Sequence, residues 1–237
     1  MELFYADNIT SDKAYFSKDE TRHISKTYRK RVGDTIEFTL GDGKLYAGVI
    51  RDISKNGLIA EIKEMTDYVK PWKGRLHMAV APTKNFNRIE WIVERMVELG
   101  LDELTPIISH RSERKKWKSN RLDRIIRAAA KQSLKCVLPI VHEPVPFESF
   151  CTSLDPETTK YFGHCEDGEK TPLKEINFQD KNVCFAIGPE GDFTKEEIDL
   201  ACSSGFRAVS LGQQRLRTET AAMKMAVAFH IYNDWEK

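Results

Sequence analysis

The chain has 237 residues, of which 41% are hydrophobic and 31% are charged, and its formal net charge is +1. This length suits one or two domains with a sizeable buried core, and the composition excludes an intrinsically disordered protein. A net charge so close to zero does not by itself indicate a nucleic-acid partner, so only the distribution of charge along the chain can do so.

Short strands and turns fill the first 70 residues. Residues 35–40 and 45–51 have the alternating apolar pattern of strands, and the Gly-Asp-Gly-Lys sequence between them is typical of a hairpin turn. A second turn, Asn-Gly, precedes a strand over residues 58–62. We therefore predict a small antiparallel β-barrel.

After a linker at residues 70–74, strands and helices alternate. The predicted strands cover residues 76–81, 104–109, 137–141, 160–163, 183–187 and 206–211. The predicted helices include one that ends at Gly100, one capped by Ser119, one with a capping box at Thr194 that ends at Gly205, and a last one from Thr218 to about Trp235. This alternation predicts a parallel sheet covered on both faces, so we divide the chain into domains 1–70 and 74–237.

Charge is unevenly distributed along the chain. Residues 109–135 hold ten Lys or Arg against two acidic residues, and residues 18–31 hold six against two. Residues 143–181 hold nine acidic residues against four basic ones, which cancels the two basic segments in the total. Basic segments of this kind are expected where a phosphate backbone binds, but a solvated helix face would have the same composition.

Two loops carry the strongest local signals for a ligand site. Residues 187–193 join a buried strand to a capped helix, and Pro189 and Gly191 suit a tight turn in which Gly191 has positive φ. The missing side chains of Gly188 and Gly191 would let a ligand approach the backbone at the carboxyl edge of the sheet. An ordinary Pro-Gly loop would look the same.

The second loop follows the strand that ends at Leu211-Gly212. Thr218 or Thr220 could cap the last helix, and Glu219 would favour the positive end of its dipole. Arg217 does not fit this explanation, because the dipole disfavours a cation at a helix N-terminus. A cation there is easier to explain if an anion or carboxylate meets it.

Other kinds of site are not indicated. The five cysteines include no Cys-x-x-Cys pair, the six histidines have no metal-ligand spacing, and no phosphate-binding Walker loop is present. We therefore expect no metal and no nucleotide hydrolase. The start of the chain lacks a signal-peptide pattern, and no apolar segment approaches the roughly 18–20 residues of a spanning helix. We expect a cytoplasmic protein with reduced thiols and no membrane anchor.

Several motifs, in order and over nearly the whole chain, match one known family. They are Arg22-His23 with residues 31–34, Lys84 with residues 98–100, residues 130–133 with Pro139, residues 187–191, and residues 211–212 with residues 216–221. Through these motifs the sequence resembles the ribosomal RNA small subunit methyltransferase E family of SPOUT methyltransferases. Asp192 departs from the family's usual second glycine, and residues 213–215 replace its usual Pro-Arg-Ile.

The resemblance implies a fold, an activity and partners. The fold would be α/β: a SPOUT-type parallel sheet with a deep trefoil knot, preceded by a PUA-like RNA-binding barrel. The activity would be methyl transfer from S-adenosylmethionine to N3 of a uridine in 16S ribosomal RNA. The partner would be the 30S subunit or its precursor. Such enzymes work as homodimers, and the last helix is a candidate interface through its apolar residues Met223, Met225, Val227, Phe229 and Trp235. Burial of that helix in the core is an equal alternative.

The resemblance also implies site residues. Those for the cofactor are Cys165, Glu166, Ile187, Gly188, Pro189, Glu190, Gly191, Leu211, Gly212, Leu216, Arg217 and Thr218. Those for ribosomal RNA phosphates are Arg22, His23, Arg29, Lys30, Lys84, Arg111, Arg114, Lys115 and Lys116. Arg217 is the candidate that orients the base or stabilises the uridine anion, and Glu219 is the candidate base or the carboxylate that orients Arg217. The alternative for Glu219 is a helix-start residue alone.

Two other activities remain open. A SPOUT enzyme could act on another RNA or another atom, because target choice depends on loop shape. A non-catalytic RNA-binding or ribosome-assembly factor could keep the same fold, but it would not need to bind S-adenosylmethionine.

Overall fold

A computed structural model describes residues 2–115, 117, 119–179 and 181–234. The chain folds into two compact units. The first contains residues 1–70 and 127–138, and the second contains residues 71–126 and 139–237. The sequence predicts domains 1–70 and 74–237, and the structure differs in that residues 127–138 belong to the first unit.

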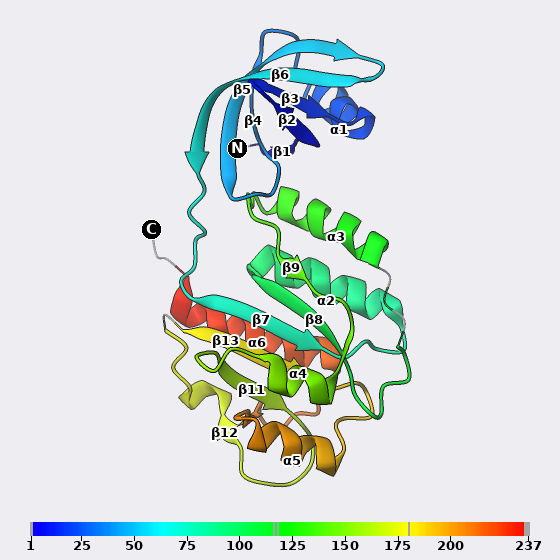
Figure 1. The fold of residues 1–237 in the computed structure, drawn as a ribbon, viewed down its shortest axis with the longest axis vertical. Coiled ribbons are helices and arrows are strands. Elements are labelled where there is room, and N and C mark those ends of the chain that lie inside the picture. Colours follow the sequence, from blue (N-terminus) through cyan, green and yellow to red (C-terminus); the bar gives the residue numbers. More distant parts are fainter. Residues whose placement is uncertain (1, 116, 118, 180, 235–237) are drawn as a thin grey trace. The chain divides into compact units, whose positions relative to one another are not determined.

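The first unit is built on a mostly antiparallel sheet (Figure 1). Its strands are β1 (Phe4–Tyr5), β2 (Asn8–Thr10), β3 (Lys13–Phe16), β4 (Thr35–Thr39), β5 (Lys44–Ser54) and β6 (Gly57–Asp67), with α1 (Lys18–Arg22) and the π-helix η1 (His23–Thr27) after β3. The strand order is β1-β4-β5-β6-β3-β2. The predicted hairpins are confirmed, because β4 pairs antiparallel with β5, and β5 pairs antiparallel with β6. Alternate side chains, including Phe16, Phe38 and Ile50, form its buried core.

Residues 127–138 belong to this unit because of contacts that are distant in sequence. Lys131, in α3 (Ser119–Gln132), places its Nζ 2.6 and 2.8 Å from the two carboxylate oxygens of Glu20. The Tyr5 hydroxyl donates to the Lys135 carbonyl over 2.7 Å. Val137 forms an isolated bridge with Asp42. The predicted strand over 137–141 is therefore reduced to β9 (Ile140–Val141), because its first residues pair in the first unit.

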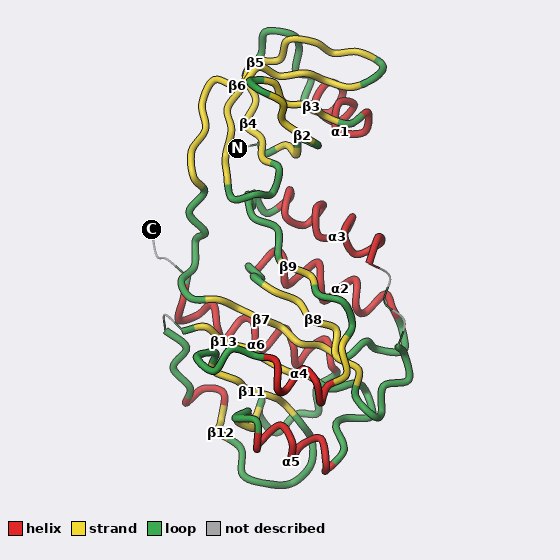
Figure 2. Tube along the Cα trace, viewed as in Figure 1, coloured by secondary structure: helices red, strands yellow, loops and turns green. Residues whose placement is uncertain are grey.

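The second unit contains a parallel sheet in the order β10-β8-β7-β13-β11-β14-β12, with β9 also paired to β8 (Figures 1 and 2). Its strands, besides β9, are β7 (Arg75–Val80), β8 (Glu103–Ile108), β10 (Val145–Pro146), β11 (Thr159–Gly163), β12 (Thr171–Pro172), β13 (Asn182–Ile187) and β14 (Arg207–Ser210). Its helices, besides α3, are α2 (Phe86–Leu99), α4 (Phe147–Ser153), the 3-10 helix η2 (Leu173–Glu175), α5 (Lys195–Ser203) and α6 (Thr218–Asn233).

Both faces of this sheet are buried. On one face, Cys184 and Ala186 of β13 join a cluster with Phe150 of α4 and Ala201 of α5. The alternate residues of β13 are also buried, and α6 packs against β7, β13 and α2. The expected α/β class, with a parallel sheet covered on both faces, is confirmed. Among the described residues, no helix is both long and apolar enough to cross a bilayer.

Candidate functional site

The two loops singled out in the sequence meet at the carboxyl edge of the sheet. Residues 188–193 follow β13, residues 211–217 follow β14, and residues 164–167 follow the intervening β11. Together they surround a cavity of about 1110 Å³. Ligands of open α/β sheets bind at this edge, where successive strands end and their loops diverge.

The loop after β13 is a tight turn, and its residue with positive φ is Asp192, one position later than expected. The Pro189 carbonyl accepts the N–H of Asp192 over 3.0 Å, so Glu190 and Gly191 are the two central residues. Asp192 has a φ of +63°, and Gly191 is outside the positive region. The prediction of positive φ at Gly191 is therefore wrong, because the turn closes with both central residues at negative φ.

Asp192 compensates for its backbone conformation through its side chain. Its carboxylate accepts the backbone N–H of Cys165 over 2.6 Å and that of Phe193 over 2.8 Å. The first bond joins the loop after β13 to the loop after β11. Burial, together with Asp192, raises the pKa of the Cys165 thiol, so this cysteine stays protonated at neutral pH.

The start of α6 is tied to the same loop. The Thr218 hydroxyl donates to the Gly188 carbonyl over 3.1 Å, and the N-cap residue is Arg217, whose side chain makes no capping bond. The prediction of Thr218 or Thr220 as N-cap is therefore wrong, because Thr218 uses its hydroxyl to join the two loops. A Cβ on Gly188 would come within 3.2 Å of the Phe193 ring, so the loop packs too closely there for a larger residue.

All twelve residues predicted to bind a cofactor lie around this one cavity. They are Cys165, Glu166, Ile187, Gly188, Pro189, Glu190, Gly191, Leu211, Gly212, Leu216, Arg217 and Thr218. His164, which precedes two of these residues in the predicted third wall of the site, also lines the cavity, and so does Arg88, which no sequence signal predicts. Burial, assisted by Lys170, lowers the pKa of His164, and its Nδ1 is buried without a hydrogen-bond partner among the described residues. A ligand could satisfy this nitrogen.

Arg88, Arg217 and Glu219 form a charged group beside the cavity. Glu219 Oε1 lies 3.6 Å from Nε of Arg88 and 3.9 Å from Nη1 of Arg217. Glu219 Oε2 is buried without a hydrogen-bond partner among the described residues, whereas the Arg217 side chain is 71% exposed. Glu219 lines a smaller cavity of about 290 Å³, and Arg88 lines both cavities. No local signal marks Arg88, because its helix is more than a hundred residues from α6.

The comparisons with known proteins agree with this geometry. An RNA methyltransferase domain model matches residues 70–230, and an RNA methyltransferase PUA domain model matches residues 16–63. A protein of Aquifex aeolicus named ribosomal RNA small subunit methyltransferase E is 29% identical over 95% of this chain and 97% of its own. A protein of the same name from Rickettsia conorii is 27% identical over 90% of this chain and 87% of its own. The chain belongs to the ribosomal RNA small subunit methyltransferase E family.

Solved structures of similar proteins cover the whole chain. A probable rRNA-methyltransferase from Porphyromonas gingivalis has a TM-score of 0.92 and 34% identity, covering 98% of each chain. A methyltransferase E family protein from Neisseria gonorrhoeae, solved with S-adenosyl methionine bound, has a TM-score of 0.86 and 25% identity, covering 100% of each chain. The expectation of a PUA-like domain before the methyltransferase sheet is confirmed.

Three of the residues predicted to bind RNA in the second unit, Lys84, Arg111 and Arg114, have partners within the chain. Arg111 donates to the carbonyls of Gly191 and Phe193 over 3.0 and 3.2 Å. Arg114 donates to the Lys84 carbonyl over 2.8 and 3.1 Å, and the Lys84 ammonium lies 2.6 Å from Glu113. Arg111 therefore holds a loop of the cavity in place, and Arg114 holds the segment that precedes α2. Lys115 is exposed, and Lys116 lies outside the described residues.

The predicted RNA-binding residues of the PUA-like unit lie around η1. Arg22 and Arg29 are exposed, and Lys30 is 3.7 Å from Glu2. The His23 ring packs edge-on against Tyr28, with a centroid distance of 5.0 Å. This group combines three cations with an imidazole and a phenol ring.

Proposed function

We propose that this protein methylates N3 of a uridine in the 16S ribosomal RNA of the small subunit, with S-adenosylmethionine as the methyl donor. The observation that supports this most directly is the cavity of about 1110 Å³ at the carboxyl edge of the sheet. All twelve cofactor residues implied by the family resemblance line it. Membership of the methyltransferase E family supplies the reaction class.

The residues of the cavity fit this cofactor. Main-chain groups of residues 188–191 and 211–218 supply donors and acceptors for an adenine edge, and the buried Nδ1 of His164 lacks a partner among the described residues. The lining contains four carboxylates and four cations, so groups of opposite charge are present for both the sulfonium and the carboxylate of this cofactor. They are Glu166, Asp167, Glu190 and Asp192, and Arg88, Lys170, Arg215 and Arg217. When bound, S-adenosylmethionine supplies an electrophilic methyl group.

The protein must activate a weak nucleophile. Uridine N3 carries a proton, and it becomes nucleophilic when that proton leaves and charge spreads over the two flanking carbonyls. We assign Arg217 to these carbonyls, because its guanidinium is exposed at the cavity. Glu219 Oε1 lies 3.6 Å from Arg88 and 3.9 Å from Arg217. Glu219 lines the smaller neighbouring cavity, and we assign its carboxylate either to orient Arg217 or to accept the N3 proton.

The target base must leave its helix. Uridine N3 lies on the Watson–Crick edge, so the base has to be unpaired or flipped out before it can enter the cavity. We propose that residues 1–70, together with the basic side chains of the second unit, hold the surrounding phosphates. The 30S subunit or its precursor is then the substrate, and the cytoplasm is the site of action.

We include a homodimer and a trefoil knot in the proposal. Met225 and Phe229 of α6 are buried in the core, but Val227 and Ile231 of the same helix are 41% and 75% exposed, which suits contact with a second copy. Trp235 lies outside the described residues. The knot is implied by the family resemblance, and the strand order, in which β13 lies between β7 and β11 although it follows β11 in the chain, is compatible with it.

The deciding experiment is methyl transfer from labelled S-adenosylmethionine to small ribosomal subunits that lack the modification, followed by mass spectrometry of the digested nucleosides. We expect N3-methyluridine at one site. A methylated product other than N3-methyluridine would show a SPOUT enzyme with another target. Absence of both methyl transfer and cofactor binding would favour a non-catalytic RNA-binding or assembly factor.

A further inference from the structure

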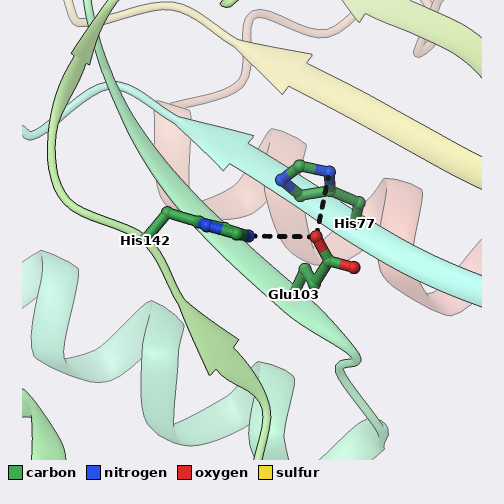
Figure 3. A group of neighbouring side chains, drawn as sticks. All are labelled: His77, Glu103 and His142. Carbon is green, nitrogen blue, oxygen red and sulfur yellow. Dashed lines mark hydrogen bonds and ion pairs between the residues drawn. The ribbon is translucent and has the colours of Figure 1, made fainter. Parts of the chain in front are cut away.

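A second cluster of titratable side chains lies at the opposite, amino-terminal edge of the parallel sheet. His77 lies in β7, Glu103 begins β8, and His142 directly follows β9 (Figure 3). These residues open onto a cavity of about 470 Å³ that shares no lining residue with the cofactor cavity. The methyl-transfer reaction gives them no role.

The three side chains converge on one carboxylate oxygen. Glu103 Oε2 lies 3.0 Å from Nε2 of His142 and 3.8 Å from Nδ1 of His77. One ligand atom from each residue can be chosen so that all lie within 4.8 Å of one another. Donors about 2.0–2.1 Å from a tetrahedral zinc ion are about 3.3 Å apart, so the observed spacing needs only small side-chain movements to fit one ion.

Neighbouring groups already orient two of the three ligands. The Thr105 hydroxyl lies 2.8 Å from Nε2 of His77, which leaves Nδ1 as the nitrogen that faces Glu103. Arg75 forms an ion pair with the other oxygen of Glu103, Oε1, so Oε2 remains directed at the two imidazoles. Outer hydrogen bonds of this kind hold histidine and carboxylate ligands in position at metal sites.

Burial and charge also suit a cation. His77 and Glu103 are buried, at 7% and 4% exposure, whereas the His142 side chain is 43% exposed. The cavity lining adds Glu143 and Asp155, so three carboxylates face the single cation Arg75. The exposed side leaves a fourth coordination position for water.

We propose that His77, Glu103 and His142 bind one zinc ion. Two imidazoles and a carboxylate, with an open fourth position, form a ligand set that zinc accepts, whereas magnesium and calcium prefer oxygen ligands alone. The ion would join β7, β8 and the segment after β9, so its effect is on stability. The sequence alone does not reveal these three ligands, because each comes from a different segment of the chain.

The test is calorimetric titration of the full-length protein, freed of metal with a chelator, using zinc chloride. We expect one zinc ion per chain and a higher melting temperature when zinc is present. Magnesium chloride should cause neither change. Cobalt(II) should give the intense visible absorption of tetrahedral coordination, without the charge-transfer band of a thiolate ligand such as the exposed Cys165 or Cys202.

Three variants separate the site from adventitious binding. His142→Ala removes an exposed ligand without disturbing the core and should abolish the titration. Thr105→Val removes the outer partner of His77 and should weaken zinc binding by roughly 10- to 100-fold. His110→Ala, an exposed histidine in another loop of the same unit, is the matched control and should bind as the parent does.

The proposal fails if the parent protein binds no zinc at micromolar concentration. It also fails if His142→Ala retains the parent's affinity, or if the cobalt complex shows thiolate ligation. These readouts do not depend on methyl transfer, so an inactive protein could still support the zinc site and an active one could still refute it.

Discussion

Asp192 shows how one side chain can make an unusual backbone conformation tolerable. A residue with a Cβ at a φ of +63° has a steric cost that glycine would avoid. Here the carboxylate accepts two backbone N–H groups, from Cys165 and Phe193, and so connects two loops of the cavity. The departure from the family's glycine is therefore compatible with an ordered cofactor loop.

Substitution of Asp192 should separate these two effects. Asp192→Ala keeps the steric cost and loses both hydrogen bonds, so we expect a loss of about 2 kcal/mol in the free energy of unfolding. Asp192→Gly loses the same bonds but removes the steric cost, so its loss should be smaller by about 1 kcal/mol. Urea denaturation of both variants measures this difference, and equal losses would contradict the role given to φ.

Arg217 is the residue on which the proposed chemistry most depends. We expect Arg217→Ala to lower kcat by roughly 100-fold, because a donor to a developing negative charge contributes mainly in the transition state. Its side chain is 71% exposed, so the free energy of unfolding should change by less than about 0.5 kcal/mol. Steady-state kinetics with the ribosomal substrate show whether the substitution changes kcat, KM or both.

Arg207→Ala is the matched control for that measurement. Arg207 is exposed at the start of β14, at the opposite end of the strand from the cavity. It should leave kcat unchanged. A rise in KM for S-adenosylmethionine with kcat intact in Arg217→Ala would instead make Arg217 a cofactor-binding residue.

At the scale of elements, the N-terminal cap of α5 is predicted by local sequence but also makes a contact with a distant loop. The predicted capping box is confirmed: Thr194 Oγ1 accepts the Glu197 N–H over 3.2 Å, and Glu197 Oε2 accepts the Thr194 N–H over 2.9 Å. The other oxygen of Glu197 accepts the N–H of His110 over 2.7 Å. The cap thus also holds the loop after β8, which no helix signal could predict.

Two substitutions should differ for this reason. Thr194→Ala removes one capping bond and should cost about 1 kcal/mol of unfolding free energy. Glu197→Ala should cost about 2–3 kcal/mol, because it also leaves the His110 N–H without its acceptor. Thermal and urea unfolding provide the values, with the exposed Thr220→Ala as control. Losses of the same size for Thr194→Ala and Glu197→Ala would show that the bond to His110 contributes nothing.

At the scale of the whole molecule, the charge distribution has two consequences. Some basic residues are structural, since Arg111 and Arg114 donate to loop carbonyls. Charge reversal at Arg111 would therefore change the cavity as well as the surface, and charge reversal at Arg114 would also disturb the segment before α2. Exposed residues, such as Arg22 and Lys115, are better probes of phosphate binding.

Binding of ribosomal RNA should weaken as salt increases. Each phosphate contact releases counterions, so Arg22→Glu and Lys115→Glu should lower affinity and reduce the slope of log K against log salt by about 1 each. Lys174→Glu, an exposed change within the acidic segment of residues 143–181, is the control and should leave both unchanged. Filter-binding assays over a salt series measure both quantities. An affinity independent of salt would overturn the proposed role of these residues.

The sequence by itself determined most of the secondary structure of the protein and its class. The strand–helix alternation after residue 70 and the caps at Gly100 and Thr194 are local signals, and each predicts an element that the structure contains. The two loops proposed to bind the cofactor could be predicted for the same reason, since turn and cap residues act over a few positions.

Only the tertiary structure decided which distant residues meet. It assigned residues 127–138 to the first unit, placed Arg88 beside Glu219, and brought His77, Glu103 and His142 to one point. It also moved the positive φ from Gly191 to Asp192. The first three arrangements depend on contacts between segments far apart in the chain, which leave no periodic or local pattern in the sequence. The position of the positive φ depends on how the turn after β13 closes, and the sequence allowed either residue.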